Sequence, residues 1–178
     1  IMVVKGTDLA PGTDAAGPLF LRDDVLDIAV TPDRGYCLSI RGLARESAQA
    51  TGSAFTDPVD RPLPEPTSGG HPVELASKSC PLFVAVGVTG IDPSRPSPRW
   101  LARRVQLAGM RPISLAVDIT NYVMLEIGQP LHAFDYERLG RHELRIRPAN
   151  PGELLTTLDG VERKMEPDML VIADSDRA

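Results

Sequence analysis

Apolar residues at helical spacing mark a first helix over residues 40–51. Its apolar side includes Ile40, Leu43, Ala44 and Ala48. Ser39 precedes this stripe and Gly52 follows it. A serine side chain can accept a hydrogen bond from the first free backbone N–H groups, and glycine commonly ends a helix in the left-handed conformation. The pattern therefore predicts a capped helix with one buried face.

A second helix is predicted after Ser97, with Pro98 at its first position and Gly109 at its end. Proline is favoured there because its missing N–H would have no partner inside the helix. Leu101, Val105 and Ala108 form the expected inner stripe, and the arginines of this helix are expected to face outward.

Short apolar runs predict strands elsewhere. The runs cover residues 25–30, 82–91, 144–147 and 169–173. Residues 154–165 predict a hairpin with Asp159-Gly160 at its turn. Strands outnumber helices and do not alternate strictly with them, which favours an α+β fold with a mixed or sandwich-like sheet and flanking helices.

The segment from Met110 to Asp135 places polar groups within apolar sequence, which needs a structural or chemical reason. The pattern of residues 113–117 predicts a buried strand. Asp118 is expected to be the N-cap of the helix that follows. This helix should end at Gly128, and residues 129–134 should be extended. In this strand–helix–strand unit, Arg111 and His132 flank the helix and could face one pocket.

Three motifs in this segment resemble one family. They are Arg111-Pro-Ile, Val117-Asp-Ile-Thr-Asn-Tyr-Val and Gly128-Gln-Pro-Leu-His-Ala-Phe-Asp. Together they are similar to the tRNA-editing domain of the bacterial phenylalanine–tRNA ligase beta subunit. Residues 26–45, 158–162 and 170–174 resemble further parts of that family, so the resemblance spans roughly residues 20–178.

The resemblance implies a fragment of a ligase that charges tRNA with phenylalanine and hydrolyses mischarged tyrosyl-tRNA. It implies an alpha-subunit partner, a cytoplasmic location, and ATP and magnesium bound elsewhere in the parent, with no cofactor in this fragment. The family continues past Ala178 into segments that supply much of the amino-acid pocket, so we expect this fragment to be inactive alone. A non-catalytic RNA-binding or subunit-interaction module is the alternative.

Proline-rich residues 56–72 predict an irregular, exposed linker. With the resemblance, this suggests four regions: the end of an oligonucleotide-binding-like domain (1–24), a small helical segment (25–55), the linker (56–72) and the first part of the editing domain (73–178).

Charge and cysteine content exclude some classes of protein. The net charge of −5 argues against general nucleic-acid binding by the whole surface, but residues 98–112 carry four arginines and no acidic residue. Cys37 and Cys80 are isolated and predict buried, reduced thiols rather than a metal site or a disulfide framework. No signal peptide or membrane-spanning segment is visible, and a chain that starts at Ile1 is expected to be a piece of a longer protein.

His132 is the candidate catalytic residue. On sequence alone a histidine of the core is the better explanation. The resemblance reverses this, because it places His132 in the editing pocket, where neutral imidazole can orient water or the ribose hydroxyls or act as a general base. The resemblance also implies that Arg111 holds the 3′ end of tRNA, with Ala116 and Asn121 as weaker lining residues.

The remaining polar residues have structural alternatives. Asp118, Thr120 and Asn121 are expected to form a helix-start network. Arg99, Arg103 and Arg104 form either a solvated face or a contact with tRNA phosphates. His71 and His142 are expected to be exposed. The sequence shows no metal-ligand cluster and no nucleophile with its base.

Overall fold

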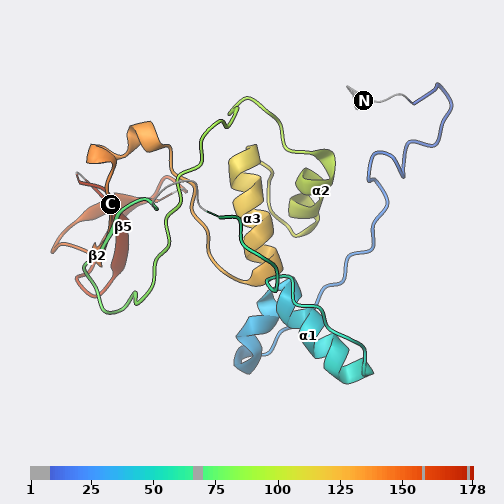
Figure 1. The fold of residues 1–178 in the computed structure, drawn as a ribbon, viewed down its shortest axis with the longest axis horizontal. Coiled ribbons are helices and arrows are strands. Elements are labelled where there is room, and N and C mark those ends of the chain that lie inside the picture. Colours follow the sequence, from blue (N-terminus) through green and yellow to red (C-terminus); the bar gives the residue numbers. More distant parts are fainter. Residues whose placement is uncertain (1–8, 66–69, 158, 176) are drawn as a thin grey trace. The chain divides into compact units, whose positions relative to one another are not determined.

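The computed structural model describes residues 9–65, 70–157, 159–175 and 177–178, and it has the expected α+β fold (Figure 1). The chain forms two compact units. The first joins the N-terminal segment up to Arg61 with Asp92–Ala133, and the second joins Pro62–Ile91 with Phe134–Ala178. Residues 92–133 therefore group with the N-terminal helical segment rather than with the sheet. The functional division of the chain at residues 56–72 stays a prediction.

Helix α1 spans Ile40–Thr51 and confirms the first predicted helix. The Ser39 side chain accepts a hydrogen bond from the Gly42 backbone N–H, and Gly52 ends the helix with φ 69°. A 3-10 helix, η1 (Pro32–Leu38), precedes α1 and packs closely on it. A Cβ on Gly42 would lie 2.0 Å from the Tyr36 carbonyl oxygen, so this contact requires glycine.

Helix α2 spans Arg99–Leu107, with Pro98 at the N-cap rather than inside the first turn. Leu101 and Val105 are buried, as predicted, whereas Ala108 lies just past the helix and is exposed. Gly109 follows with φ 85°, a left-handed conformation that suits a residue without a Cβ.

Helix α3 spans Leu115–Ile127 and corrects the prediction of a strand over residues 113–117. Ser114, not Asp118, is the N-cap, and its side chain accepts from the Val117 N–H. Gly128 ends the helix with φ 78°, as predicted. Residues 128–135 are irregular, so the strand–helix–strand unit does not form. Apolar runs of five residues fit a helix start as well as a strand, which explains the error.

The second unit contains a three-stranded sheet in the order β1-β2-β5. Strand β1 (Val73–Leu75) pairs in parallel with β2 (Leu144–Pro148), and β5 (Leu170–Ala173) pairs antiparallel with β2. The predicted strands over 144–147 and 169–173 are thus confirmed. Ile146 is 1% exposed and, with the buried Leu144, Val171 and Ala173, forms the core of this unit.

Two further strands, β3 (Leu154–Thr156) and β4 (Glu162–Lys164), form the predicted hairpin. The Gly160 N–H donates to the Thr157 carbonyl in its turn, and Leu158 lies outside the described residues. The two 3-10 helices η2 (Tyr136–Arg138) and η3 (Gly140–His142) precede β2.

The predicted strands over residues 25–30 and 82–91 are wrong, because both segments are irregular. A strand needs a hydrogen-bonding partner, and no described strand pairs with either segment. Leu82, Val84 and Val86 remain at least 73% exposed. The described residues of the proline-rich stretch, 56–65 and 70–72, are irregular as predicted.

Both cysteines are free. Cys37 is buried and Cys80 is half-buried. The prediction of unlinked thiols is confirmed, although only one of them lies in a core.

Candidate functional site

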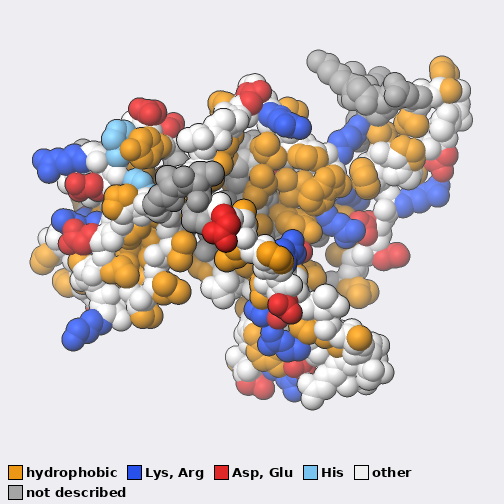
Figure 2. All heavy atoms as spheres, viewed as in Figure 1, with side chains coloured by type: hydrophobic (Ala, Val, Ile, Leu, Met, Phe, Trp, Pro, Cys, Tyr) orange, Lys and Arg blue, Asp and Glu red, His pale blue; other side chains and the backbone are white. Residues whose placement is uncertain are grey.

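Helices α2 and α3 pack together within the first unit and carry most of the predicted site residues. Trp100 meets Tyr122 edge to face, with ring centroids 5.5 Å apart. This edge-to-face arrangement is favoured by the opposite charges of ring edge and ring face. Figure 2 shows hydrophobic side chains at the surface over α2 and α3. Trp100 of α2 is 46% exposed and Ile119 of α3 is 45% exposed.

Asp118 is 1% exposed and lies in the first turn of α3. Its carboxylate accepts hydrogen bonds from the Ser97 hydroxyl and, at 2.8 Å, from the Ile113 N–H. Thr120 Oγ1 donates to the Val117 carbonyl at 2.8 Å. These contacts support the helix-start interpretation of both residues, with Asp118 acting from inside the helix rather than as its cap.

Arg111 precedes α3 and His132 follows it, and both side chains are exposed. A helix of 13 residues is about 20 Å long, so the two residues leave α3 at opposite ends. The strand–helix–strand geometry behind the expected shared pocket is absent. A common pocket for Arg111 and His132 therefore stays a prediction.

Ala116 and Asn121 are both half-buried on α3. Five positions along an α-helix correspond to a rotation of about 140°, so their side chains leave the helix in different directions. A pocket lined by both would have to extend around the helix. Their role in binding also stays a prediction.

The α2 arginines differ in their surroundings. Arg99 and Arg104 are exposed, as predicted, and Arg104 lies 3.8 Å from an Asp23 carboxylate oxygen. Arg103 is half-buried, which corrects the expectation that all three face outward. Its Nε is buried and has no hydrogen-bond partner among the described residues, and its Nη1 lies 3.5 Å from the Gln106 side-chain oxygen.

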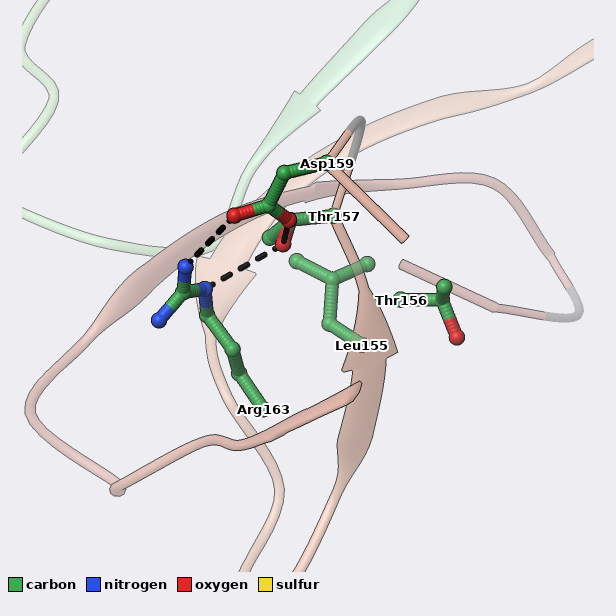
Figure 3. Close-up of a pocket in the computed structure, with 5 residues that line it drawn as sticks. All are labelled: Leu155, Thr156, Thr157, Asp159 and Arg163. Atoms are coloured by element: carbon green, nitrogen blue, oxygen red, sulfur yellow. Dashed lines mark hydrogen bonds and ion pairs between the residues drawn. The ribbon is translucent and has the colours of Figure 1, made fainter. Parts of the chain in front are cut away.

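An open hollow of about 560 Å³ lies on the β3–β4 hairpin and is lined by Leu155, Thr156, Thr157, Asp159 and Arg163 (Figure 3). Arg163 binds Asp159 Oδ2 at 2.9 Å and Thr157 Oγ1 at 3.2 Å. The ion pair neutralises the arginine within the hollow. None of the predicted site residues lines it.

The structure adds an ion pair that the sequence analysis missed. Arg147 donates two hydrogen bonds of 2.7 Å to the two carboxylate oxygens of Glu153, and the Asn150 N–H donates a third at 2.8 Å. The Arg147 hydrogen bonds, followed by that from Asn150, lower the pKa of Glu153 to about 2. Opposite charges six residues apart across a turn give no distinctive sequence signal.

His71 corrects another expectation, because it is half-buried rather than exposed; His142 is exposed as predicted. Within the described residues, no three His, Cys, Asp or Glu side chains are grouped so that they could hold a metal ion. No helix in the described part of the chain is long and apolar enough to cross a membrane.

Comparison with known proteins agrees with the resemblance. The chain is 58% identical over 175 residues to the phenylalanine–tRNA ligase beta subunit of Thermobifida fusca, and 55% identical over 174 residues to that of Streptomyces avermitilis. The alignments cover 98% and 97% of this chain but only 21% of each relative. The chain thus spans about a fifth of the length of the curated relatives it matches.

These similarities confirm the resemblance to phenylalanine–tRNA ligase beta subunits. A family model described as the B3/4 domain matches residues 79–178, more than half of the chain. The chain belongs to the B3/4 domain family.

Proposed function

We propose that this chain is part of a phenylalanine–tRNA ligase beta subunit and contributes to hydrolytic editing of mischarged tyrosyl-tRNA. The observation that carries the proposal is the 58% identity to such a subunit over nearly the whole chain. The parent charges tRNA with phenylalanine in the cytoplasm and works with an alpha subunit. ATP and magnesium serve the ligation step in a part of the parent outside this chain.

Editing is needed because the selection of phenylalanine over tyrosine by binding alone is limited. Tyrosine differs from phenylalanine by one hydroxyl, and an apolar pocket rejects an isostere with an added hydroxyl by only about 10²-fold. A second site that recognises the hydroxyl and hydrolyses the wrong ester removes the remaining errors. An aminoacyl ester is already activated, so a positioned water and a stabilised oxyanion suffice without a protein nucleophile.

In this proposal the His132 imidazole orients the attacking water or the terminal ribose, or accepts a proton from that water as a general base. Its exposed position in the irregular segment after α3 leaves the imidazole accessible to a substrate. The guanidinium of Arg111, also exposed, contacts the phosphate backbone of the tRNA 3′ end. Ala116 and Asn121 line the site, and Arg99, Arg103 and Arg104 add positive charge on α2.

The test is deacylation of tyrosyl-tRNA by the complete ligase. His132→Ala should reduce the rate by about 10²–10⁴-fold if the imidazole is a general base. Gln129→Ala, in the same exposed segment, is the matched control and should leave the rate unchanged. Phenylalanine activation should stay normal in both variants because it occurs at another site.

The alternative, a non-catalytic module that positions RNA or another subunit, gives a different result. It predicts that His132→Ala and Gln129→Ala deacylate tyrosyl-tRNA equally well. Arg111→Gln would then weaken tRNA binding without a specific effect on hydrolysis. Arg95→Gln, at another exposed arginine in a loop of the same unit, serves as its control.

A further inference from the structure

Three aromatic rings meet in the second unit, two from neighbouring 3-10 helices and one from a segment more than 60 residues earlier. The rings of Tyr136 and His142 stack with centroids 4.1 Å apart and planes 7° from parallel. The ring of His71 meets Tyr136 edge to face at 5.9 Å. The Tyr136–His142 pair, called the ring stack below, belongs to η2 and η3, and His71 lies just before β1.

The backbone holds this arrangement in an unfavourable conformation. Arg141 and His142 have φ values of 50° and 55°, in the left-handed region that residues with a Cβ rarely adopt. His142 Nδ1 lies 2.9 Å from the Tyr136 carbonyl oxygen, and the Gly140 N–H donates to Asp174 Oδ2 at 3.0 Å. Such strain persists where the surrounding contacts fix it, and here those contacts bring His142 flat onto Tyr136.

The ring stack stays open to solvent. Tyr136 is 51% exposed and His142 is exposed, and Figure 2 shows histidine side chains at the surface over η2 and η3. By contrast, the Nε2 atom of His71 is buried and has no hydrogen-bond partner among the described residues. A buried polar atom without a partner is uncommon in folded proteins.

The charges beside the ring stack are mixed. Arg138 and Arg141 are exposed in the same turns, and so are Glu137 and Glu143. The local net charge is therefore small, and ring surface rather than charge is the distinctive feature. Flat exposed rings beside arginines are the means by which proteins hold unpaired bases of single-stranded RNA.

We propose that the ring stack binds an unpaired nucleobase of RNA by stacking, with Arg138 or Arg141 next to its phosphate. If the proposed function holds, the RNA is a single-stranded part of tRNA. Binding at the ring stack does not itself require hydrolysis, so the two proposals can fail separately.

The test measures the Kd of the 178-residue chain for a short fluorescein-labelled single-stranded oligoribonucleotide by anisotropy. Tyr136→Leu should raise the Kd about 5–150-fold, since stacking on one aromatic ring contributes roughly 1–3 kcal/mol per base. Tyr136→Phe keeps the ring and should bind like the unmodified chain. Tyr36→Leu removes a similarly exposed tyrosine, 47% exposed, from the other unit and should have no effect.

Circular dichroism checks that each variant is folded. A duplex of the same sequence hides its base faces, so Tyr136→Leu should leave duplex binding unchanged. The proposal is overturned if the unmodified chain does not bind the oligonucleotide, if folded Tyr136→Leu binds as tightly, or if Tyr136→Phe is as weak as Tyr136→Leu. Equal losses for duplex and single strand would also overturn it. Deacylation by the complete ligase carrying His132→Ala tests the proposed function separately.

Discussion

The hydroxyl of Ser97 donates a hydrogen bond to the buried carboxylate of Asp118, 21 residues further along the chain. This bond joins the segment just before α2 to the first turn of α3. The same carboxylate accepts from the Ile113 N–H, so one side chain fixes the segments that precede both helices. Asp118 thereby positions the helix pair that carries most of the candidate site.

Asp118→Ala should lower the free energy of unfolding of the first unit by about 1–3 kcal/mol, because it leaves the Ile113 N–H without its acceptor. Trp100 is the chain's only tryptophan and packs on Tyr122 of α3, so its fluorescence during urea unfolding reports on this unit. Asp27→Ala, at an exposed position of the same unit, is the control. Equal midpoints for the two variants would contradict a stabilising role.

Gly42→Ala should lower the free energy of unfolding by on the order of 1–3 kcal/mol. The added Cβ would overlap the Tyr36 carbonyl oxygen and disturb the packing of α1 on η1. Gly35→Ala meets no atom within 4 Å and should have a much smaller effect. Thermal unfolding followed by circular dichroism compares the two variants. A Gly42→Ala protein as stable as Gly35→Ala would show that the contact is looser than described.

The Arg147–Glu153 pair should make the second unit sensitive to acid. The folded-state pKa of Glu153, about 2, is below its ordinary value near 4.5, so the stabilisation is present above pH 4.5. It is lost as the pH falls from about 4.5 to 2 and the unfolded state binds a proton that the folded state does not. Glu153→Gln should therefore reduce stability at pH 7 but make little difference at pH 2.

Urea unfolding followed by far-ultraviolet circular dichroism at several pH values measures how the stability difference between Glu153→Gln and the unmodified chain shrinks toward pH 2. Glu162→Gln, at an exposed position on β4, provides the comparison. A constant difference between Glu153→Gln and the unmodified chain down to pH 2 would contradict the assigned ion pair.

The isolated chain should hydrolyse tyrosyl-tRNA little or not at all. Arg111 and His132 are exposed, and the hollow on the hairpin contains neither of them. Discrimination of a hydroxyl needs an enclosed polar partner, and hydrolysis needs a fixed water. Rapid hydrolysis by the 178-residue chain in a single-turnover assay would show that the site is already assembled.

Self-association is expected through residues 82–88, where Leu82, Val84, Val86 and Val88 are 67–76% exposed. Contiguous exposed apolar side chains on an irregular segment favour contact with other chains. Val86→Lys should lower the associated fraction in sedimentation velocity. Leu63→Lys, at an 84% exposed leucine in the proline-rich stretch, should not change that fraction to the same extent.

Local signals in the sequence predicted some elements closely. Helix α1 begins and ends where Ser39 and Gly52 indicated, because both caps act within their own turn. The β3–β4 hairpin and strands β2 and β5 also formed where expected. Prediction was less successful for strands, because a strand forms only where a neighbouring strand can pair with it. Residues 82–91 have a strand-like pattern but are irregular, and no described strand lies beside them.

The candidate site was harder to predict than the fold. The motifs around Arg111 and His132 identified the family, but the interpretation of residues 113–117 as a strand placed Asp118 at the cap instead of inside the helix. Ser114 was the available signal, since serine before an apolar run is a common N-cap. The Asp118 hydrogen bonds and the Arg147–Glu153 pair depend on tertiary contacts, which spacing along the chain does not reveal.

The interleaving of the two units has a consequence for synthesis on the ribosome. The first unit needs Asp92–Ala133 as well as the N-terminal segment, and Pro62–Ile91 of the second unit is translated between them. Helix α1 can form early, but its neighbour α3 appears only about 65 residues later, which takes several seconds at typical elongation rates. During that interval α1 lacks its packing partner, so chaperone binding to the nascent first unit is the expected result of this chain order.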